Sequence, residues 1–285
     1  MKRVLVLLLI AAGFLQAAEP ARVRIVAANL TSGTRQSYSP DNGNHSNLEG
    51  AGARILKALN PDIVLIQEFN TTMPVRQWIN STLGREFQFA REEDPGIPNG
   101  IISRFPIIES GEWDDAKLDN RDFVWAKIAL PDGTKLWAVS VHLYSQKSTT
   151  RAEQAAALVS FLREKVQPGE RIVVGGDFNT RALSEDCLRE FANLLTVPEI
   201  PPSDQLGNGN TNEKRSRPYD WVLVDAKTEA AEMPVEIAGN AFADGFVFDS
   251  RVFEPSQLPP PVQPGDSGVN GMQHMAVVRD FAVGK

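Results

Sequence analysis

The sequence contains a single cysteine, Cys187, among 285 residues, so no disulfide can form within one chain. A chain of this length can bury a core large enough to fold without such a cross-link. Cys187 lies in a predicted helix, residues 183–195, where a small buried apolar side chain is its commonest role. The lack of a second cysteine therefore excludes a disulfide-stabilised scaffold.

Positive charge is also in short supply. The chain has 29 Lys and Arg against 36 Asp and Glu, a net charge of −7, and no run of five or more basic residues. Such runs give proteins that bind nucleic acid tightly and non-specifically their electrostatic attraction. This class is therefore disfavoured, but an enzyme that reaches two or three phosphates through a metal and a few arginines is not excluded.

The sequence begins with an apolar run that is too short to span a bilayer, the twelve residues Val4–Leu15. Two basic residues precede this run and two small residues, Ala17 and Ala18, follow it, which is the order of a secretory signal peptide. A retained anchor or a buried helix is the alternative. We expect residues 1–18 to be removed and residues 19–285 to form one exported domain, periplasmic or extracellular, with no transmembrane segment.

A glycine-rich turn follows the most apolar predicted strand. Ile172–Val174 is typical of a buried strand, and Gly175 and Gly176 let the backbone turn after it. Asp177 and Asn179 follow at a spacing of two, which places both side chains on one face if the chain stays extended. A carboxylate and a carboxamide there could hold a water, a metal or a phosphate oxygen. An ordinary turn is the alternative, since Gly, Asp and Asn all favour turns.

Other predicted strands also carry a polar side chain at or near one end. These strands cover residues 23–29, 62–68, 135–143, 219–224 and 274–278. The polar residues at or near their ends are Asn29, Glu68, His142, Asp220 and His274. Because strand ends of stacked sheets can converge on one rim, these side chains are candidates for a shared site.

The order of the predicted elements indicates an α/β fold with mixed sheets. Helical spacing of apolar residues predicts helices over 48–59 and 149–166. Residues 123–130 and 135–143 are expected to form a hairpin around Pro131-Asp-Gly133. Hairpins among alternating strands and helices argue against a purely parallel sheet. No internal repeat, heptad pattern or domain-sized linker is visible.

Taken in order, these motifs resemble the endonuclease/exonuclease/phosphatase superfamily, which includes pancreatic-type deoxyribonucleases, abasic-site endonucleases, neutral sphingomyelinases and inositol polyphosphate 5-phosphatases. The resemblance covers roughly residues 23–281. It rests on Asn29, on the motifs at 61–68, 100–107, 141–143, 175–179 and 219–223, and on His274. It implies a four-layer α/β sandwich, with two mixed β-sheets face to face and helices outside, and metal-dependent hydrolysis of a phosphate ester.

The resemblance also implies roles for the residues near the metal and the attacking water. Glu68 matches the principal metal ligand, and Asn29 matches a companion that positions metal or phosphate. Asp177 matches the residue that orients or deprotonates water, and Asn179 the one that holds a phosphate oxygen. Mg²⁺ is the expected ion, with Mn²⁺ or Ca²⁺ as alternatives, because such ions take oxygen ligands.

Histidines are rare, and two of the three fall at positions that the resemblance marks. His142 and His274 match the active-site histidines, and Asp220 matches the carboxylate that pairs with the last histidine. His45 lies in a polar loop and is expected to face solvent. Arg121 resembles an arginine that reaches phosphate in some nucleases, with a surface arginine as the alternative. Asn99 is either a loop cap or a phosphate contact.

The sequence departs from the family pattern at one position of the site. The family usually has Asp before the last histidine, and this chain has Gln273. The site then has one carboxylate fewer, which puts metal affinity or metal choice in doubt. Asp266, eight residues before His274, is a candidate substitute with no direct support from spacing.

The shared motifs leave the substrate open. A phosphodiester is expected, with nuclease activity on DNA or RNA as the leading subclass, and no stable protein partner is implied. A sphingomyelinase-like lipid phosphodiesterase and a phosphomonoesterase are the rivals. Phe242, Phe246, Phe248 and Phe253 could form an apolar patch for membranes, although core packing is their commoner role. A non-catalytic phosphate-binding relative is the alternative from another class.

Overall fold

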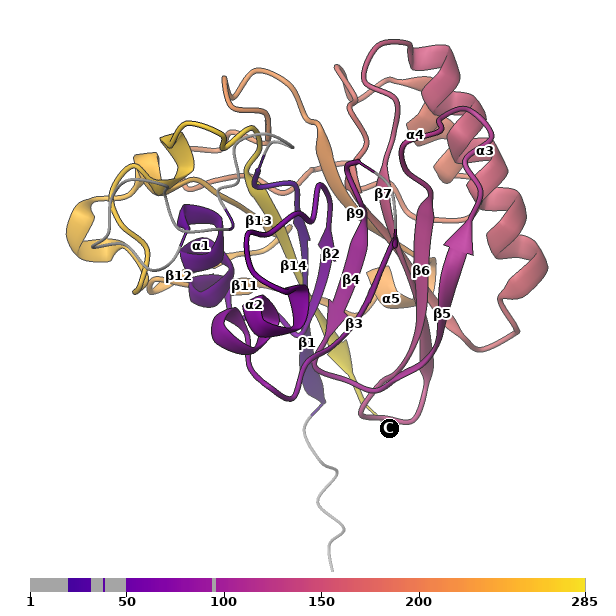
Figure 1. The fold of residues 1–285 in the computed structure, drawn as a ribbon, viewed down its shortest axis with the longest axis horizontal. Helices are drawn as coiled ribbons and strands as arrows, with labels where there is room; N and C mark the ends of the chain where they lie inside the picture. Colours follow the sequence, from indigo (N-terminus) through magenta and orange to yellow (C-terminus); the bar gives the residue numbers. More distant parts are fainter. Residues whose placement is uncertain (1–19, 32–37, 39–49, 94–95, 285) are drawn as a thin grey trace, which may run out of the picture.

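The computed structural model describes residues 20–31, 38, 50–93 and 96–284. Residues 1–18, where the signal peptide is expected, and His45 lie outside the described residues. Within the described part, no helix is long and apolar enough to cross a membrane. The described elements build two large β-sheets with helices on their outer faces (Figure 1).

The larger sheet has seven strands, in the order β10-β14-β1-β2-β4-β3, with β13 also paired to β14. β1 runs parallel to β2 and antiparallel to β14. The strands are β1 (Ala21–Ala28), β2 (Ile63–Ile66), β3 (Gln88–Arg91), β4 (Gly100–Ser103), β10 (Glu232–Met233), β13 (Phe246–Phe248) and β14 (Ala276–Val283). The ends of β1 and β2 and the start of β14 therefore share one edge.

The smaller sheet has five strands, in the order β5-β6-β7-β8-β9. β7 and β8 are parallel, and the other neighbours are antiparallel. The strands are β5 (Ile107–Trp113), β6 (Phe123–Ala129), β7 (Lys135–His142), β8 (Arg171–Asp177) and β9 (Asp220–Val224). β6 and β7 form the hairpin that the turn at 131–133 predicts. A separate two-stranded sheet pairs β11 (Val235–Ile237) with β12 (Asn240–Phe242).

Figure 1 shows α1 and α2 on one side of the two sheets and α3 and α4 on the other, so the four-layer sandwich is confirmed. The helices are α1 (Ala51–Leu59), α2 (Val75–Thr82), α3 (Ser148–Lys165), α4 (Asp186–Phe191) and α5 (Ala226–Glu229). Three 3₁₀ turns follow, η1 (Ser250–Val252), η2 (Pro255–Gln257) and η3 (Asp266–Gly268).

The two-residue alternation of the strands divides the core into two clusters. On β7, Leu136 and Ala138 pack in the cluster that the two sheets share. Trp137 and Val139 face the other way and pack with Leu158 of α3. Because side chains alternate between the faces of a strand, Ser140 and His142 fall on the side of Leu136, which faces the larger sheet.

Several sequence predictions are corrected in detail. The helix around Cys187 covers only residues 186–191, and the last strand begins at Ala276 instead of His274. Cys187 is buried, as predicted. Phe246, Phe248 and Phe253 are also buried, and Phe242 packs against them, so these aromatics belong to the core and form no membrane patch.

Candidate active site

Three predicted site residues lie side by side at one edge of the smaller sheet. His142 is the register partner of Asp177 across β7 and β8, and Asp177 is the partner of Asp220 across β8 and β9. On β8, the alternation that turns Val173 into the shared core also turns Asp177 toward the larger sheet. Hydrogen bonding between strands therefore brings together residues that lie up to 78 positions apart in the sequence.

The larger sheet brings three more predicted residues to the facing edge. Asn29 directly follows β1, Glu68 follows β2 after one residue, and His274 precedes β14 by one residue. Because β1 and β2 are parallel and β14 is antiparallel to β1, these three positions share one end of the sheet. All three are buried. The predicted residues of both sheets thus converge on a single rim.

Two glycines of β8 allow the sheets to approach each other at this rim. A Cβ on Gly176, where φ is +132°, would lie 2.2 Å from the carbonyl oxygen of Val141 and 2.4 Å from Nε2 of Gln67. Gln67 comes from the opposite sheet and donates a hydrogen bond of 2.9 Å to Ser140 Oγ. A side chain at residue 176 would therefore push apart the strand ends that carry Asp177 and Glu68.

Asp177 is the centre of the hydrogen-bonding network. Asn29 Nδ2 donates to its Oδ2 over 3.2 Å, and Asn179 donates from the backbone N–H to Oδ1 (2.8 Å) and from Nδ2 to Oδ2 (3.0 Å). His142 Nε2 lies 3.2 Å and His274 Nε2 3.6 Å from the same Oδ2. Side chains at the ends of β1, β7 and β8 and just before β14 therefore all lie close to one carboxylate.

His274 is held by a second carboxylate. Its Nδ1 lies 2.8 Å from Asp220 Oδ2, and both side chains are buried. Burial lowers the pKa of His274, but the carboxylates of Asp220 and Asp177 outweigh this and raise it to about 9. The Asp220 carboxylate keeps a proton on Nδ1, and because the ring is protonated at neutral pH, Nε2 also carries a proton toward the site. The pairing that the resemblance implies is present in the structure.

The pKa values of His142 and Asp177 are shifted in opposite directions. Burial and the positive charges of Arg121 and His274 lower the pKa of His142 well below its usual value. His142 is therefore neutral at neutral pH, with its Nε2 3.2 Å from Asp177 Oδ2. Burial, with a contribution from Asp220, raises the pKa of Asp177 to about 7. Groups with strongly shifted pKa values in one place are typical of active sites.

The acidic residues of the rim form a candidate site for a divalent ion. Ligand atoms of Asp177, Asp220 and His274 all lie within 4.8 Å of one another. The Oδ1 atoms of Asn29 and Asp220 are buried without a hydrogen-bond partner among the described residues. Carboxylate and amide oxygens are the donors that Mg²⁺ and Ca²⁺ prefer. The residues present thus fit such an ion.

Glu68 lies outside that compact group but within the same electrostatic environment. Its charge contributes to the raised pKa of His274 and acts on the guanidinium of Arg121. Glu68 and Asn179 both adopt left-handed backbone, with φ of 49° and 52°. Strained backbone of this kind clusters at functional sites. The assignment of Glu68 as the principal metal ligand stays a prediction.

Arg121 is a buried residue of the rim, contrary to the surface alternative. Its Nε donates to the carbonyl oxygen of His142 over 2.6 Å, and its Nη2 to that of Leu143 over 3.3 Å. These bonds fix the guanidinium beside the end of β7. Asn99 is tied to the same region, because its Nδ2 donates to the carbonyl oxygen of Asp122 over 2.8 Å.

Among the described residues, no carboxylate close by in the sequence takes the place of the aspartate that the family usually has before the last histidine. Asp266 does not replace the missing carboxylate, because it is buried in a bidentate pair with Arg54, with distances of 2.6 and 2.9 Å. Gln273 is exposed, and its carbonyl oxygen accepts a hydrogen bond from the N–H of Glu213 over 2.7 Å. The site therefore has one carboxylate fewer than the family pattern.

Sequence reasoning missed some members of the site. Tyr219 directly precedes Asp220, and its ring lies 5.4 Å from the ring of His274. Glu92 is buried and accepts hydrogen bonds from the backbone N–H groups of Asn99 and Asp122. Burial raises its pKa to about 7. The sequence offers one indication that Tyr219 belongs to the site, its position directly before Asp220.

Comparisons with known proteins agree with this geometry. The model of the endonuclease/exonuclease/phosphatase family matches residues 45–242, so the chain belongs to that family, whose members hydrolyse phosphate esters. No curated protein matches the chain.

Solved structures of low sequence identity share the fold. An endonuclease/exonuclease/phosphatase family protein from Bacteroides thetaiotaomicron is 14% identical with a TM-score of 0.59, covering 94% of this chain and 100% of its own. TDP2 from Caenorhabditis elegans is 16% identical with a TM-score of 0.58, covering 92% of this chain and 75% of its own. A functionally unknown protein from Enterococcus faecalis is 10% identical with a TM-score of 0.61, covering 92% and 100%.

Proposed function

We propose that this chain is an exported, divalent-metal-dependent phosphodiesterase that acts on nucleic acid. The observation that carries the proposal is the convergence on Asp177 of two histidines and two asparagines from both sheets. The network combines groups that can accept a proton with groups that can donate to phosphate oxygens. A purely structural role does not explain why so many polar groups are buried at the open ends of strands.

A divalent ion bound at the rim would supply positive charge against the non-bridging oxygens of the phosphate. Glu68 and the unpartnered Oδ1 of Asn29 are the proposed ligands on the larger sheet. Asp177 and Asp220 offer carboxylate oxygens from the facing sheet. These residues suit an ion that keeps several waters and needs only one or two carboxylates.

The side chains have complementary tasks in this proposal. Asp177, the carboxylate on which the network converges, is the proposed acceptor of the proton of the attacking water. His274 carries positive charge at neutral pH, and its Nε2–H donates to a phosphate oxygen or to the leaving oxygen. The guanidinium of Arg121 adds a fixed donor at the same rim, and the Nδ2 group of Asn179, which is bonded to Asp177 and to the carbonyl oxygen of Leu143, is a proposed donor that must exchange one of these bonds for a phosphate oxygen. Fixed donors of this kind stabilise charge that develops in the transition state.

Two sets of metal ligands are open to a direct test. The resemblance favours Glu68, whereas the compact group in the structure is Asp177, Asp220 and His274. Binding of Mn²⁺, followed by electron paramagnetic resonance, separates the two without any reaction. If Glu68 holds the ion, Glu68→Gln weakens Mn²⁺ binding at least tenfold and Asp220→Asn does so far less. The reverse order assigns the ion to the compact group.

Export and substrate class rest on separate grounds. The proposed export rests on the N-terminal signal pattern of residues 1–18. The proposed nucleic acid substrate rests on family membership and on Arg121 beside the rim. The burial of Phe246, Phe248 and Phe253, with Phe242 packed half-buried against them, removes the one feature that favoured a lipid substrate.

The test is hydrolysis of a linear single-stranded oligonucleotide by the purified protein in Mg²⁺, with p-nitrophenyl phosphate and p-nitrophenyl phosphorylcholine assayed in parallel. We expect turnover of the oligonucleotide that EDTA abolishes and that His274→Ala reduces at least 10³-fold. Turnover of only the phosphomonoester or only the phosphorylcholine ester would replace the nuclease assignment. No metal-dependent turnover of any substrate would identify a non-catalytic relative.

A further inference from the structure

A pocket of about 390 Å³ adjoins His274 on the side of β9. Lys214, Arg217, Tyr219 and His274 are among the residues that line it. The Tyr219 ring lies 5.4 Å from that of His274 at an interplanar angle of 44°, and Arg217 Nη1 is 3.5 Å from the Tyr219 hydroxyl. The pocket thus places an aromatic face and two cationic side chains directly beside a residue of the proposed reaction.

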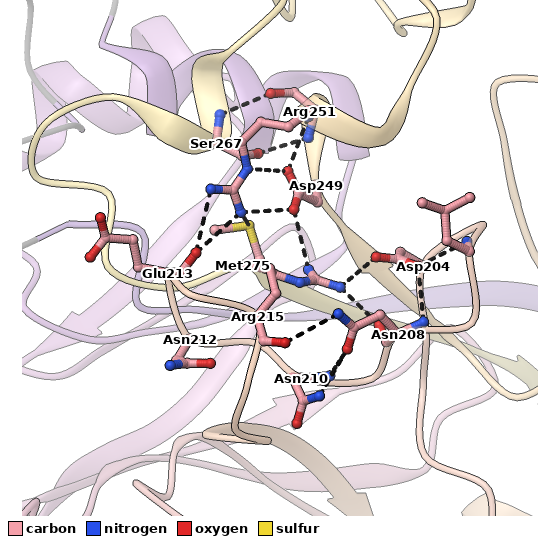
Figure 2. A network of polar contacts seen from close by, with 12 residues as sticks. Asp204, Asn208, Asn210, Asn212, Glu213, Arg215, Asp249, Arg251, Ser267 and Met275 are labelled. Carbon is pink, nitrogen blue, oxygen red and sulfur yellow. Dashed lines mark hydrogen bonds and ion pairs between the residues drawn. The ribbon is translucent and has the colours of Figure 1, made fainter.

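The loop that carries Glu213 and Arg215 is fixed to the rest of the protein by a network of polar contacts (Figure 2). Arg215 has left-handed backbone, with φ of 54°, and its Nη2 donates to Asp204 Oδ2 (2.5 Å) and to the carbonyl oxygen of Asn208 (2.8 Å). Its Nη1 lies 3.6 Å from Asp249. Arg251 also pairs with Asp249, over 2.8 Å. The guanidinium of Arg215 is therefore committed to the inner side of the loop.

The same loop is tied to the backbone around His274. The N–H of Glu213 donates to the carbonyl oxygen of Gln273, and the N–H of Met275 donates to that of Thr211, each over 2.7 Å. Asn212 and His274 form an isolated antiparallel bridge. These bonds give the pocket a fixed position relative to His274, so a group bound in the pocket has a defined distance from the reacting phosphate.

The two cations of the pocket have no carboxylate partner among the described residues. Arg217 and Lys214 are absent from every ion pair of that part of the chain, whereas Arg215 and Arg251, which brace the same loop, both pair with Asp249. The only carboxylate in the pocket lining is Glu213, which is exposed. Two unpaired cations in a braced pocket are suited to bind an anion.

The opposite flank of the site has the reverse charge. Arg121 lines two adjoining depressions of about 790 and 450 Å³. Seven carboxylates line them: Glu92 and Asp115 are buried and Asp122 is half-buried, whereas those of Glu93, Glu112, Asp114 and Asp119 are exposed. The one other cation, Lys117, pairs with Glu153 over 2.6 Å. This flank therefore repels a chain of phosphates.

The two flanks lie on either side of Asp177. Arg121 is fixed to the backbone at the end of β7, and Tyr219 directly precedes β9. β8, which carries Asp177, lies between these two strands in the sheet. A nucleic acid strand that ran across the rim in both directions would place its phosphates on the acidic flank, within the Debye length of roughly 8 Å at physiological ionic strength.

We propose that the pocket of Lys214, Arg217 and Tyr219 binds the phosphate and base next to the cleaved phosphodiester, and that the strand ends at the acidic flank. The protein would then remove nucleotides from an end of a single strand and leave closed circles largely uncut. Base stacking on Tyr219 and phosphate binding by Arg217 are sequence-tolerant contacts of the kind that single-strand-binding proteins use. This inference rests on the proposed nuclease function and specifies its substrate.

The test compares linear and covalently closed single-stranded DNA of equal length and sequence in Mg²⁺. Bis(p-nitrophenyl) phosphate serves as a small phosphodiester without neighbouring phosphates or nucleobases. We expect the linear strand to shorten from an end and the circle to be cut at less than a tenth of that rate. Cleavage of the circle as fast as the linear strand would overturn the inference and leave the phosphodiesterase function intact. No hydrolysis of any of the three would overturn the proposed function itself.

Variants locate the effect in the two flanks. Arg217→Ala and Tyr219→Ala are each expected to lower the ratio of kcat/KM for the oligonucleotide to kcat/KM for bis(p-nitrophenyl) phosphate at least tenfold. The double variant Asp114→Lys with Asp119→Lys is expected to raise cleavage of the circle at least fivefold. Unchanged values in both experiments would overturn the assignment of the flanks.

Lys135→Ala is the matched control for these variants. Lys135 is exposed at the opposite end of β7 from His142, roughly 23 Å away at 3.3 Å per residue. Its replacement removes one positive charge from the protein without touching the rim. We expect it to leave the ratio of the two kcat/KM values and the rate on the circle unchanged.

Discussion

Replacement of Gly176 by alanine tests how the two sheets meet at the site. Gly176 has φ of +132°, a conformation that residues with a side chain rarely adopt. The added Cβ would lie 2.2 Å from the carbonyl oxygen of Val141 and 2.4 Å from Nε2 of Gln67. The first neighbour is strand backbone, which cannot rotate away, so β7 and β8 must move apart.

The magnitude follows from two contributions. Strained backbone at a residue with a side chain costs about 1–3 kcal/mol. Overpacking that forces backbone shifts costs about a further 1–3 kcal/mol. We therefore expect Gly176→Ala to lower the free energy of unfolding by about 4 kcal/mol. At about 2–4 °C per kcal/mol for a domain of this size, Tm falls by about 8–16 °C.

The assay is thermal unfolding followed by circular dichroism, with two glycines as controls. Gly133 has φ of +83° and open space around it, so Gly133→Ala reports backbone strain alone, about 1–2 kcal/mol. Gly96 has neither feature, so Gly96→Ala is expected to be close to neutral. A Tm for Gly176→Ala no lower than that for Gly133→Ala would refute the close approach of Val141 and Gln67 to residue 176.

Three further predictions concern buried ionisable groups. The folded-state pKa of His274, about 9, exceeds the ordinary value of 6.5. Its stabilisation of the folded state, about 3 kcal/mol, is therefore full below pH 6.5 and is lost as the pH rises through 9. Asp220→Asn is expected to flatten this dependence of stability on pH, as measured by urea unfolding in EDTA. Asp266→Asn removes the carboxylate that pairs with buried Arg54 and is expected to lower stability by about 3 kcal/mol without changing Mg²⁺ affinity. Burial raises the pKa of Cys187 to about 12, so the native thiol is expected to resist Ellman's reagent at pH 8 and to react in urea.

Asp244 is exposed, so Asp244→Asn should keep the wild-type slope between pH 6.5 and 9. An unchanged slope in Asp220→Asn would contradict the coupling of that residue to His274. Weakened Mg²⁺ binding in Asp266→Asn would return Asp266 to the metal site. Rapid reaction of the native thiol would contradict the burial of Cys187.

The strands and most of the site could be predicted because both follow local rules. Buried strands such as Ile63–Ile66 and Arg171–Asp177 are short apolar runs, and a polar residue at the end of such a run is conspicuous. Asn29, Glu68 and Asp177 were found in this way. The register that sets Asp177 beside His142 and Asp220 then places them on one face.

Other features depend on contacts that no local pattern reveals. The strands β10 to β13 have two or three residues each, too few to show a two-residue alternation. Arg215 reaches Asp249, which lies 34 residues away, so the bracing of the pocket beside His274 is visible only in the fold. Gln67 reaches Ser140 in the other sheet for the same reason.

The direct test of the proposed site is hydrolysis of bis(p-nitrophenyl) phosphate in Mg²⁺ by the wild-type protein and by His274→Ala, each shown to be folded by circular dichroism. We expect metal-dependent turnover by the wild type that EDTA abolishes, and a loss of at least 10³-fold in His274→Ala, while Lys135→Ala keeps the wild-type rate. Near-wild-type turnover by a folded His274→Ala would contradict the assignment of the active site to this rim.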